Sequence, residues 1–209
     1  MWTPTALASE FRRYRKTVWR VVEAQHRIST NRLAENLEDQ ARLEELAEGA
    51  KPDLPKSAQG LHYLLASPFR YGHKSPSRFR RADERPGIFY ASEAESTAIA
   101  ETAYWRLRFF SRSPDFVPGN RTSEHLSFSV AVSTSRAIDL SRPPFDTQAS
   151  DWVHPNDYKA CQDFADVARK ADAQLIRTVS RLNAIAAFPG GGSYAFEPEI
   201  LGLPSSPRH

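Results

Sequence analysis

The sequence contains few of the residues that mark secreted, metal-binding or membrane proteins. Cys161 is the only cysteine among 209 residues, which excludes an intramolecular disulfide and a metal site built from several cysteines. No run of 18 apolar residues is present, and no apolar run follows the basic residues near the N-terminus, so neither a membrane span nor a signal peptide is predicted. We therefore expect a cytoplasmic protein.

Several motifs that would identify a site directly are also missing. The chain has no GxGxxG or Walker loop, no HExxH and no GxSxG. The segment "PGGGSYAF" does not open a predicted helix, so it favours a flexible turn over a phosphate-binding loop. The six histidines are scattered along the chain, and no metal site is expected from them.

The overall composition is that of a folded protein with a slight excess of positive charge. Hydrophobic residues make up 40% and charged residues 25%, and the net charge is +3. Within residues 70–85, six basic side chains stand against two acidic ones. This basic segment could bind a phosphate-bearing ligand, but the small net charge does not indicate a dedicated nucleic-acid-binding protein.

The pattern of apolar residues predicts helices first and strands later. Residues 5–48 contain no proline and are rich in Leu, Ala, Glu and Arg, which predicts two or more helices. Residues 49–60 read as a linker. From Leu61 onward, short apolar runs predict strands, and they include "LHYLLA", "GIFYA", "LSFSVAVS", "AIDL", "AQLIRTVS" and "AIAAF".

Two single helices are predicted among these strands. One follows Ser92, where "SEAE" has the spacing of a capping box, and the other follows Pro155. In the second helix, Tyr158, Cys161, Phe164 and Ala168 fall at helical spacing and are expected to form the buried face. Strands in succession with helices inserted singly indicate an α+β fold with a mixed, mostly antiparallel sheet.

A few polar residues stand out as candidates for chemistry. Glu101 lies on an otherwise small and apolar helical stretch, where it is either a solvated glutamate paired with Arg106 or Arg108 or a carboxylate turned into a cleft. Tyr90 is a core tyrosine or a ring in a binding site. The loop residues Arg70 and Arg78 are solvated, or they bind a pyrophosphate near Tyr71.

Taken in order, several short motifs resemble one family. "PFRY" (68–71), "SRFR" (77–80), "GIFYAS" (87–92), "TAIAE" (97–101) and "IRTVSRLN" (176–183) resemble the RES domain. The upstream "WRVVEAQHRIST" resembles the N-terminal helical extension of ParT-like RES toxins. One departure is Ser77, which stands where the family more usually has a glycine.

This resemblance implies a fold, an activity and a set of partners. The chain would comprise an N-terminal helical extension (1–56) and a RES domain (57–209) similar to diphtheria-toxin-type ADP-ribosyltransferases. It would be the toxin of a toxin–antitoxin pair, would consume NAD without a metal, and would bind a small helical antitoxin of the Xre or ParS type. ADP-ribose would pass to a protein, with phosphoribosyl pyrophosphate synthetase the acceptor associated with ParT, or to water or phosphate.

The same resemblance assigns roles to individual residues. Glu101, Arg78 and Ser180 would be catalytic, and Arg70, Tyr71, Arg78, Tyr90 and Ser180 would bind NAD. Cleavage of the nicotinamide–ribose bond develops positive charge on the sugar, which a fixed carboxylate at position 101 would stabilise. Two other interpretations stay open: a nucleic-acid-binding surface at residues 70–85, and an interaction module in the N-terminal helices.

Overall fold

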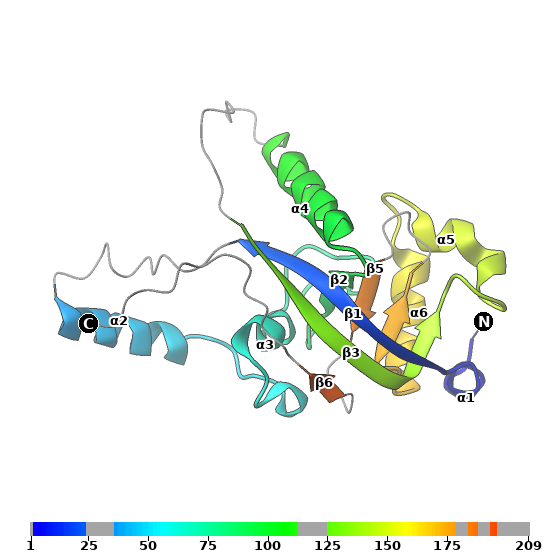
Figure 1. The fold of residues 1–209 in the computed structure, drawn as a ribbon, viewed down its shortest axis with the longest axis horizontal. Coiled ribbons are helices and arrows are strands. Elements are labelled where there is room, and N and C mark those ends of the chain that lie inside the picture. Colours follow the sequence, from blue (N-terminus) through cyan, green and yellow to red (C-terminus); the bar gives the residue numbers. More distant parts are fainter. Residues whose placement is uncertain (1, 24–35, 113–124, 179–183, 188–192, 196–209) are drawn as a thin grey trace.

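The computed structural model describes residues 2–23, 36–112, 125–178, 184–187 and 193–195, and it has an α+β fold (Figure 1). The helices and strands follow one another as α1 (Pro4–Ala8), β1 (Arg12–Glu23), α2 (Leu37–Gly49), η2 (Lys56–Ala58), α3 (Tyr63–Arg70), β2 (Phe89–Ser92), α4 (Glu95–Phe110), β3 (His125–Asp139), η3 (Asp146–Gln148), α5 (Ala149–Val153), α6 (Lys159–Lys170), β4 (Leu175–Arg177), β5 (Ala184–Ala187) and β6 (Ser193–Ala195). No helix in these ranges is long and apolar enough to cross a membrane.

The strands form one mixed sheet that curls back on itself. Its order is β1-β2-β5-β4-β3-β6, and β1 also pairs with β3. The β3–β4 pair is parallel, and the other five pairs of strands are antiparallel. The predicted α+β class with a mostly antiparallel sheet is therefore confirmed.

The strand β1 corrects the prediction of helices in residues 5–48. Residues 12–23 are extended and pair with β3 from Arg12↔Ala137 to Glu23↔His125. Tyr14 and Val18 are buried on this strand, while Arg15, Lys16 and Thr17 between them are exposed. β-Branched and aromatic residues favour a strand when a long partner is available, and here that partner lies a hundred residues further along the chain. The extension is thus helical in α1 and α2 but not in residues 12–23.

The segment "LHYLLA" was also predicted wrongly, because it lies mostly in helix α3 and not in a strand. Leu65, Ala66 and Phe69 are the buried residues of α3, and their spacing is helical. Leucine and alanine have good helix propensity, so the apolar run alone could not distinguish the two structures.

The helix after Ser92 is confirmed, but its predicted capping box is wrong. The helix α4 begins at Glu95 with Ala94 as its N-cap, and no side chain caps it. Ser92 belongs instead to β2, where it pairs with Ala184 of β5 and with Trp19 of β1. The sheet therefore holds Ser92 in an extended conformation and delays the start of the helix.

Two buried clusters form the core. One contains Phe79, Ile88 and Ile138 together with α6, whose residues Cys161, Phe164 and Ala168 are buried as predicted. Tyr158, which was predicted for the same face, is the N-cap residue of α6 and is only partly buried. The other contains Val18, Phe69, Phe89 and Val130 and lies between the sheet and α3. Neighbouring residues of β2 divide between the clusters, since Phe89 belongs to the second and Tyr90 packs against the first.

Helix α4 is mostly exposed although it contacts the sheet. It contacts β1 and β2 and extends away from the sheet toward its C-terminal end (Figure 1). Only Ala98 of this helix is buried, and Ile99, Tyr104, Trp105, Leu107 and Phe109 are exposed. The position of Glu101 on α4 is therefore near the end that meets the sheet.

Candidate active site

Glu101 is partly buried beside the sheet, and charged and polar groups from other elements surround it. Burial raises the pKa of its carboxyl group, while Trp105, Arg78, Arg20 and Ser92 act in the opposite direction. The predicted alternative of a solvated pair with Arg106 or Arg108 is not what the structure shows. Arg106 instead donates to Glu23 at 2.8 Å, and Arg108 donates to the Asn156 side chain at 3.2 Å.

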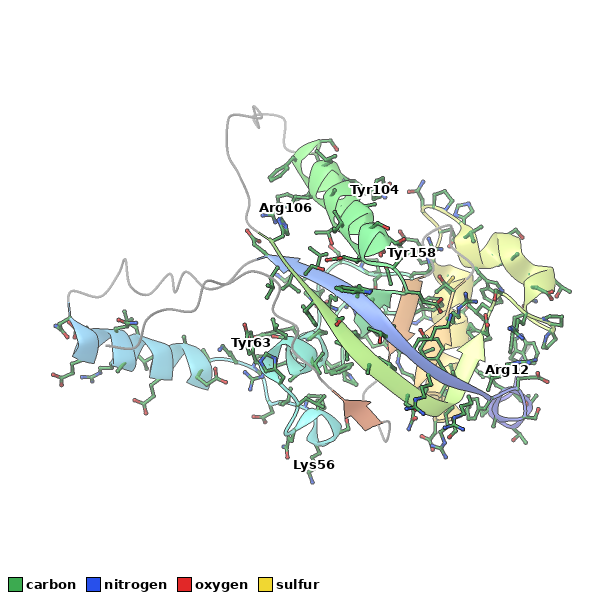
Figure 2. All side chains as sticks on the ribbon, viewed as in Figure 1. Arg12, Lys56, Tyr63, Tyr104, Arg106 and Tyr158 are labelled. Atoms are coloured by element: carbon green, nitrogen blue, oxygen red, sulfur yellow. The ribbon has the colours of Figure 1, made fainter. Side chains whose placement is uncertain are left out.

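The side chains that follow Glu101 along helix α4 project in different directions. Arg106 and Tyr104 project from different sides of the helix, with Arg106 directed toward the end of β1 (Figure 2). Residues 101 and 105 are one turn apart and share a face, so Trp105 lies next to the Glu101 carboxylate. The hydroxyl group of Ser92 on β2 also acts on the Glu101 carboxylate, although its buried Oγ has no hydrogen-bond partner of normal geometry among the described residues.

Arg78 is held in the loop before β2 by contacts with the α5–α6 connection. Its Nη1 donates to the carbonyl oxygens of Trp152 at 2.7 Å and His154 at 3.0 Å. Its guanidinium carbon lies 5.0 Å from the centre of the Tyr158 ring. These contacts fix a positive charge that acts on Glu101 and opposes the rise that burial causes in the pKa of that carboxyl group.

Tyr90 fixes the same loop from the other side. Its hydroxyl oxygen lies 2.8 Å from Ser77 Oγ and accepts a hydrogen bond from the Phe79 backbone nitrogen at 3.2 Å. Burial raises the pKa of this phenol. Ser77, the residue that departs from the more usual glycine, therefore has a structural role here, and Tyr90 positions the segment that carries Arg78.

Arg70 and Tyr71 lie at the end of α3. The Arg70 Nη1 pairs with Glu48 Oε1 of α2 at 2.7 Å, and the pair is exposed. Tyr71 is the C-cap residue of α3 and is partly buried. This ion pair connects Arg70 to α2, and no contact among the described residues joins it to Glu101. Ser180 lies outside the described residues, so its predicted role stays a prediction.

Two further arginines of the basic segment, Arg80 and Arg81, are engaged within the protein. Arg80 is 4% exposed and donates to the carbonyl oxygens of His73, Ser75 and Arg81. Arg81 pairs with Asp163 and Asp166 of α6. A surface for nucleic acid needs cations directed outward, so these contacts disfavour that alternative.

Arg20 is the site residue that the sequence-based prediction missed. It lies on β1, and its Nη1 donates to the Tyr90 carbonyl oxygen at 3.1 Å. Its guanidinium carbon lies 5.0 Å from the centre of the Phe89 ring. Burial lowers the pKa of Arg20 to about 10, and the Glu101 carboxylate acts against this change. A helix was predicted for this segment, so the alternation that places Arg20 beside β2 was not recognised.

The described residues contain no group of three or more His, Cys, Asp or Glu side chains that could hold a metal ion. The candidate site contains one carboxylate on α4 and two guanidinium groups that act on it, one from β1 and one from the loop before β2. Such an arrangement can bind an anionic ligand and stabilise positive charge that develops next to the carboxylate.

The RES domain model matches residues 54–203. The chain belongs to the RES domain family. The matched part of this RES domain protein contains Arg70, Arg78, Tyr90 and Glu101, while Arg20 precedes it. No curated protein matches the chain. Among solved structures, a search finds a similarity to the crystal structure of the M. tuberculosis MbcT–MbcA toxin–antitoxin complex, with 12% identity, coverage of 91% of this chain and 89% of that chain, and a TM-score of 0.46.

Proposed function

We propose that this RES domain protein is the toxin of a toxin–antitoxin pair and that it cleaves the bond between nicotinamide and ribose in NAD. Membership of the RES domain family supports this proposal. The observation that carries it is the position of Glu101, a partly buried carboxylate whose pKa responds to the guanidinium groups of Arg78 and Arg20. This combination fits a substrate with an anionic bridge and a sugar that becomes cationic.

In the proposed reaction the bond between ribose C1′ and the nicotinamide nitrogen breaks, and its electron pair goes to nicotinamide. The leaving group departs neutral, so no general acid is required. Positive charge develops on the ribose, and the ionised Glu101 stabilises it. An acceptor oxygen then bonds to C1′ and loses its proton.

Arg78 binds the pyrophosphate in this proposal. A guanidinium group can donate two parallel hydrogen bonds to phosphate oxygens, and the backbone carbonyls that hold Arg78 fix its direction beforehand. Arg70 contributes at the phosphate or ribose, Ser180 at the carboxamide or a ribose hydroxyl, and Tyr71 is a candidate to stack on the nicotinamide ring. Tyr90 either stacks on the nicotinamide ring or acts through the loop that it holds.

The acceptor of ADP-ribose defines two versions of the proposal. In the first, the acceptor is a protein, with phosphoribosyl pyrophosphate synthetase as the candidate from the ParT-like resemblance. In the second, water or phosphate accepts the group and the protein depletes NAD. Labelled NAD incubated with a cell lysate separates them, because label on a protein band supports transfer and label only in free products supports hydrolysis or phosphorolysis.

A protein partner is also part of the proposal. Large apolar side chains exposed on one helix commonly mark a protein interaction surface, and α4 exposes Leu107 at 69% and Phe109 at 64%. We assign this surface to the antitoxin. Because Glu101 lies on the same helix, a partner bound there would lie close to the proposed site.

The catalytic assignment is tested by Glu101→Gln. We expect nicotinamide release from NAD to fall on the order of 10² to 10³ fold, because one well-placed electrostatic group is lost. Glu95→Gln is the matched control, since Glu95 lies in the first turn of the same helix, and it should retain the parent rate. A folded Glu101→Gln variant that still released nicotinamide at the parent rate would rule out the assignment.

A further inference from the structure

The guanidinium group of Arg78 is held by the protein through its Nη1 atom. This nitrogen donates to the carbonyl oxygens of Trp152 at 2.7 Å and His154 at 3.0 Å, and the group also neighbours the buried thiol of Cys161. Neither Nε nor Nη2 donates to an oxygen atom of any residue that the structure describes. The parallel N–H groups at these two nitrogens can bind two oxygens of a phosphate group. Because Arg78 is only partly buried, a ligand can reach this Nε–Nη2 edge.

Arg80 and Arg81, which follow in the same loop, direct their donors to protein groups. Arg80 is 4% exposed, and its Nη1 and Nη2 donate to three backbone carbonyl oxygens. Arg81 places its Nε and Nη2 against Asp166 Oδ2, at 3.2 Å and 3.0 Å. Of these three arginines, Arg78 is therefore the one whose Nε–Nη2 edge has no carbonyl or carboxylate acceptor in the described part of the chain.

The ring of Tyr158 supplies a second constraint on Arg78. The guanidinium carbon lies 5.0 Å from the centre of that ring, which is close enough for a cation–π contact. The hydrogen bonds from Nη1 fix one end of the planar group, and an aromatic face fixes the orientation of its plane. The ring and the two carbonyl groups together set the direction of the Nε–Nη2 edge.

Tyr158 is itself held firmly, although it is not a core residue. It is the N-cap residue of α6, and its carbonyl oxygen accepts a hydrogen bond from the Gln162 backbone nitrogen at 2.8 Å. Its hydroxyl group donates to the Pro155 carbonyl oxygen at 3.2 Å. Among the described residues, Tyr158 belongs to neither buried cluster. Core packing therefore does not account for the ring, whose described ring contact is with Arg78.

We propose that Tyr158 is a positioning residue for Arg78, and that the Nε–Nη2 edge of Arg78 is the part that binds the pyrophosphate. The inference rests on the proposed function for the identity of the ligand, but the placement of Arg78 by Tyr158 does not depend on NAD. Tyr158 acts through Arg78 and does not touch the reacting atoms. A guanidinium group already held in its binding orientation loses less freedom when a phosphate binds, so removal of the ring should weaken binding more than chemistry.

The placement of Arg78 is tested without NAD, from the Nε–H signal of its side chain in a proton–nitrogen NMR spectrum. The signal is assigned by its loss in Arg78→Lys. A ring shields protons that lie over its face, so Tyr158→Leu should move the signal downfield. Tyr158→Phe keeps the ring and should leave the signal near its parent position. Tyr63→Leu is the matched control and should leave it unchanged, because Tyr63 is 59% exposed and begins α3.

The consequence for binding is measured with ADP-ribose, which contains the pyrophosphate but lacks the nicotinamide bond. Tyr158→Leu should weaken its binding roughly fivefold, since one cation–π contact is lost. Tyr158→Phe and Tyr63→Leu should bind it like the parent. In an Arg78→Met background, Tyr158→Leu should cause no further loss, because the ring acts only through Arg78. For nicotinamide release, KM for NAD should rise by a similar factor while kcat stays near the parent value.

An unmoved Arg78 signal in folded Tyr158→Leu would overturn the inference, and so would an equal loss of ADP-ribose binding with and without Arg78. If Tyr158→Leu does not fold, Tyr158→Phe decides: parent-like binding supports the role of the ring, and weakened binding overturns it, because the ring is then still present. A moved signal in a protein that neither binds ADP-ribose nor releases nicotinamide from NAD would contradict the proposed function but retain the positioning of Arg78 by Tyr158.

Discussion

Glu101 and Glu93 are both partly buried carboxylates near the end of β2, yet their surroundings move their pKa in opposite directions. For Glu101, burial raises the pKa and outweighs its polar neighbours. For Glu93, burial also acts upward, but hydrogen bonds from Arg177 and Lys16 outweigh it and the pKa is lowered. The Glu101 carboxylate is therefore suited to a functional role, whereas the Glu93 carboxylate is suited to stabilising the fold.

This difference predicts opposite effects of two equivalent substitutions on stability. Because the folded-state pKa of Glu101 is raised, its contribution is present at low pH and is lost as the pH rises through that pKa. Glu101→Gln should therefore have a higher Tm than the parent, with a difference that grows from pH 4 to pH 8. Thermal unfolding at several pH values measures it, and a lower Tm at pH 8 would contradict the assigned environment.

The matched substitution Glu93→Gln should destabilise the protein. The lowered pKa of Glu93 means that its contribution is present above the ordinary range of a glutamate and is lost as the pH falls through the folded-state value. We expect a loss of about 1–2 kcal/mol at pH 7 in the same unfolding measurement, since charged hydrogen bonds to Arg177 and Lys16 are removed.

At the scale of elements, the close contact between the end of α3 and the start of β2 fixes the loop that carries Arg78. A Cβ atom at Gly87 would lie 2.0 Å from the carbonyl oxygen of Pro68 and 2.8 Å from that of Tyr71. Both neighbours are backbone atoms, so they cannot move aside as a flexible side chain could. Glycine at position 87 thus allows α3 to meet β2.

We expect Gly87→Ala to destabilise the protein by about 2 kcal/mol or more, because the backbone of α3 or β2 must shift. It should also reduce nicotinamide release, since the loop before β2 moves with it. Gly49→Ala is the control, because nothing lies within 4 Å of a Cβ atom at that helix position. Chemical denaturation compares the two, and equal stabilities would show that the contact between α3 and β2 is looser than described.

At the scale of the whole molecule, β1 is part of the same sheet as the strands within the RES segment. It pairs with β3 along its length and with β2 at Trp19↔Ser92. Tyr14 and Val18 of β1 belong to a buried cluster that also contains Phe69 and Phe128. The predicted boundary at residue 56 stays a prediction, but residues 12–23 are structurally part of the main body.

Residues 54–209 alone, which begin where the RES match begins, should therefore not fold into a stable domain. Removing β1 would expose one edge of β3 and the apolar residues that β1 covers. We expect no cooperative thermal transition by circular dichroism for this segment, whereas residues 1–209 should show one. A cooperative transition for the shorter chain would mean that β1 is dispensable for the fold.

The sequence by itself determined the fold class, α4, α6 and most of the strands, because these depend on local periodicity and propensity. The buried face of α6, with Cys161, Phe164 and Ala168, was readable from helical spacing alone. Glu101 was also recognisable, since a carboxylate on a small and apolar helical stretch is visible without a structure. The order of the family motifs along the chain then associated Arg78 and Tyr90 with Glu101. The roles of these residues stay predictions.

Tertiary structure alone decided three features. Residues 12–23 became a strand because β3 supplied a partner from far along the chain, which outweighed helical propensity. "LHYLLA" became a helix because Leu65 and Phe69 pack against the sheet. Arg20 reached the Tyr90 carbonyl oxygen because β1 lies beside β2 at Trp19↔Ser92. Each of these depends on contacts between distant segments, which local patterns do not encode.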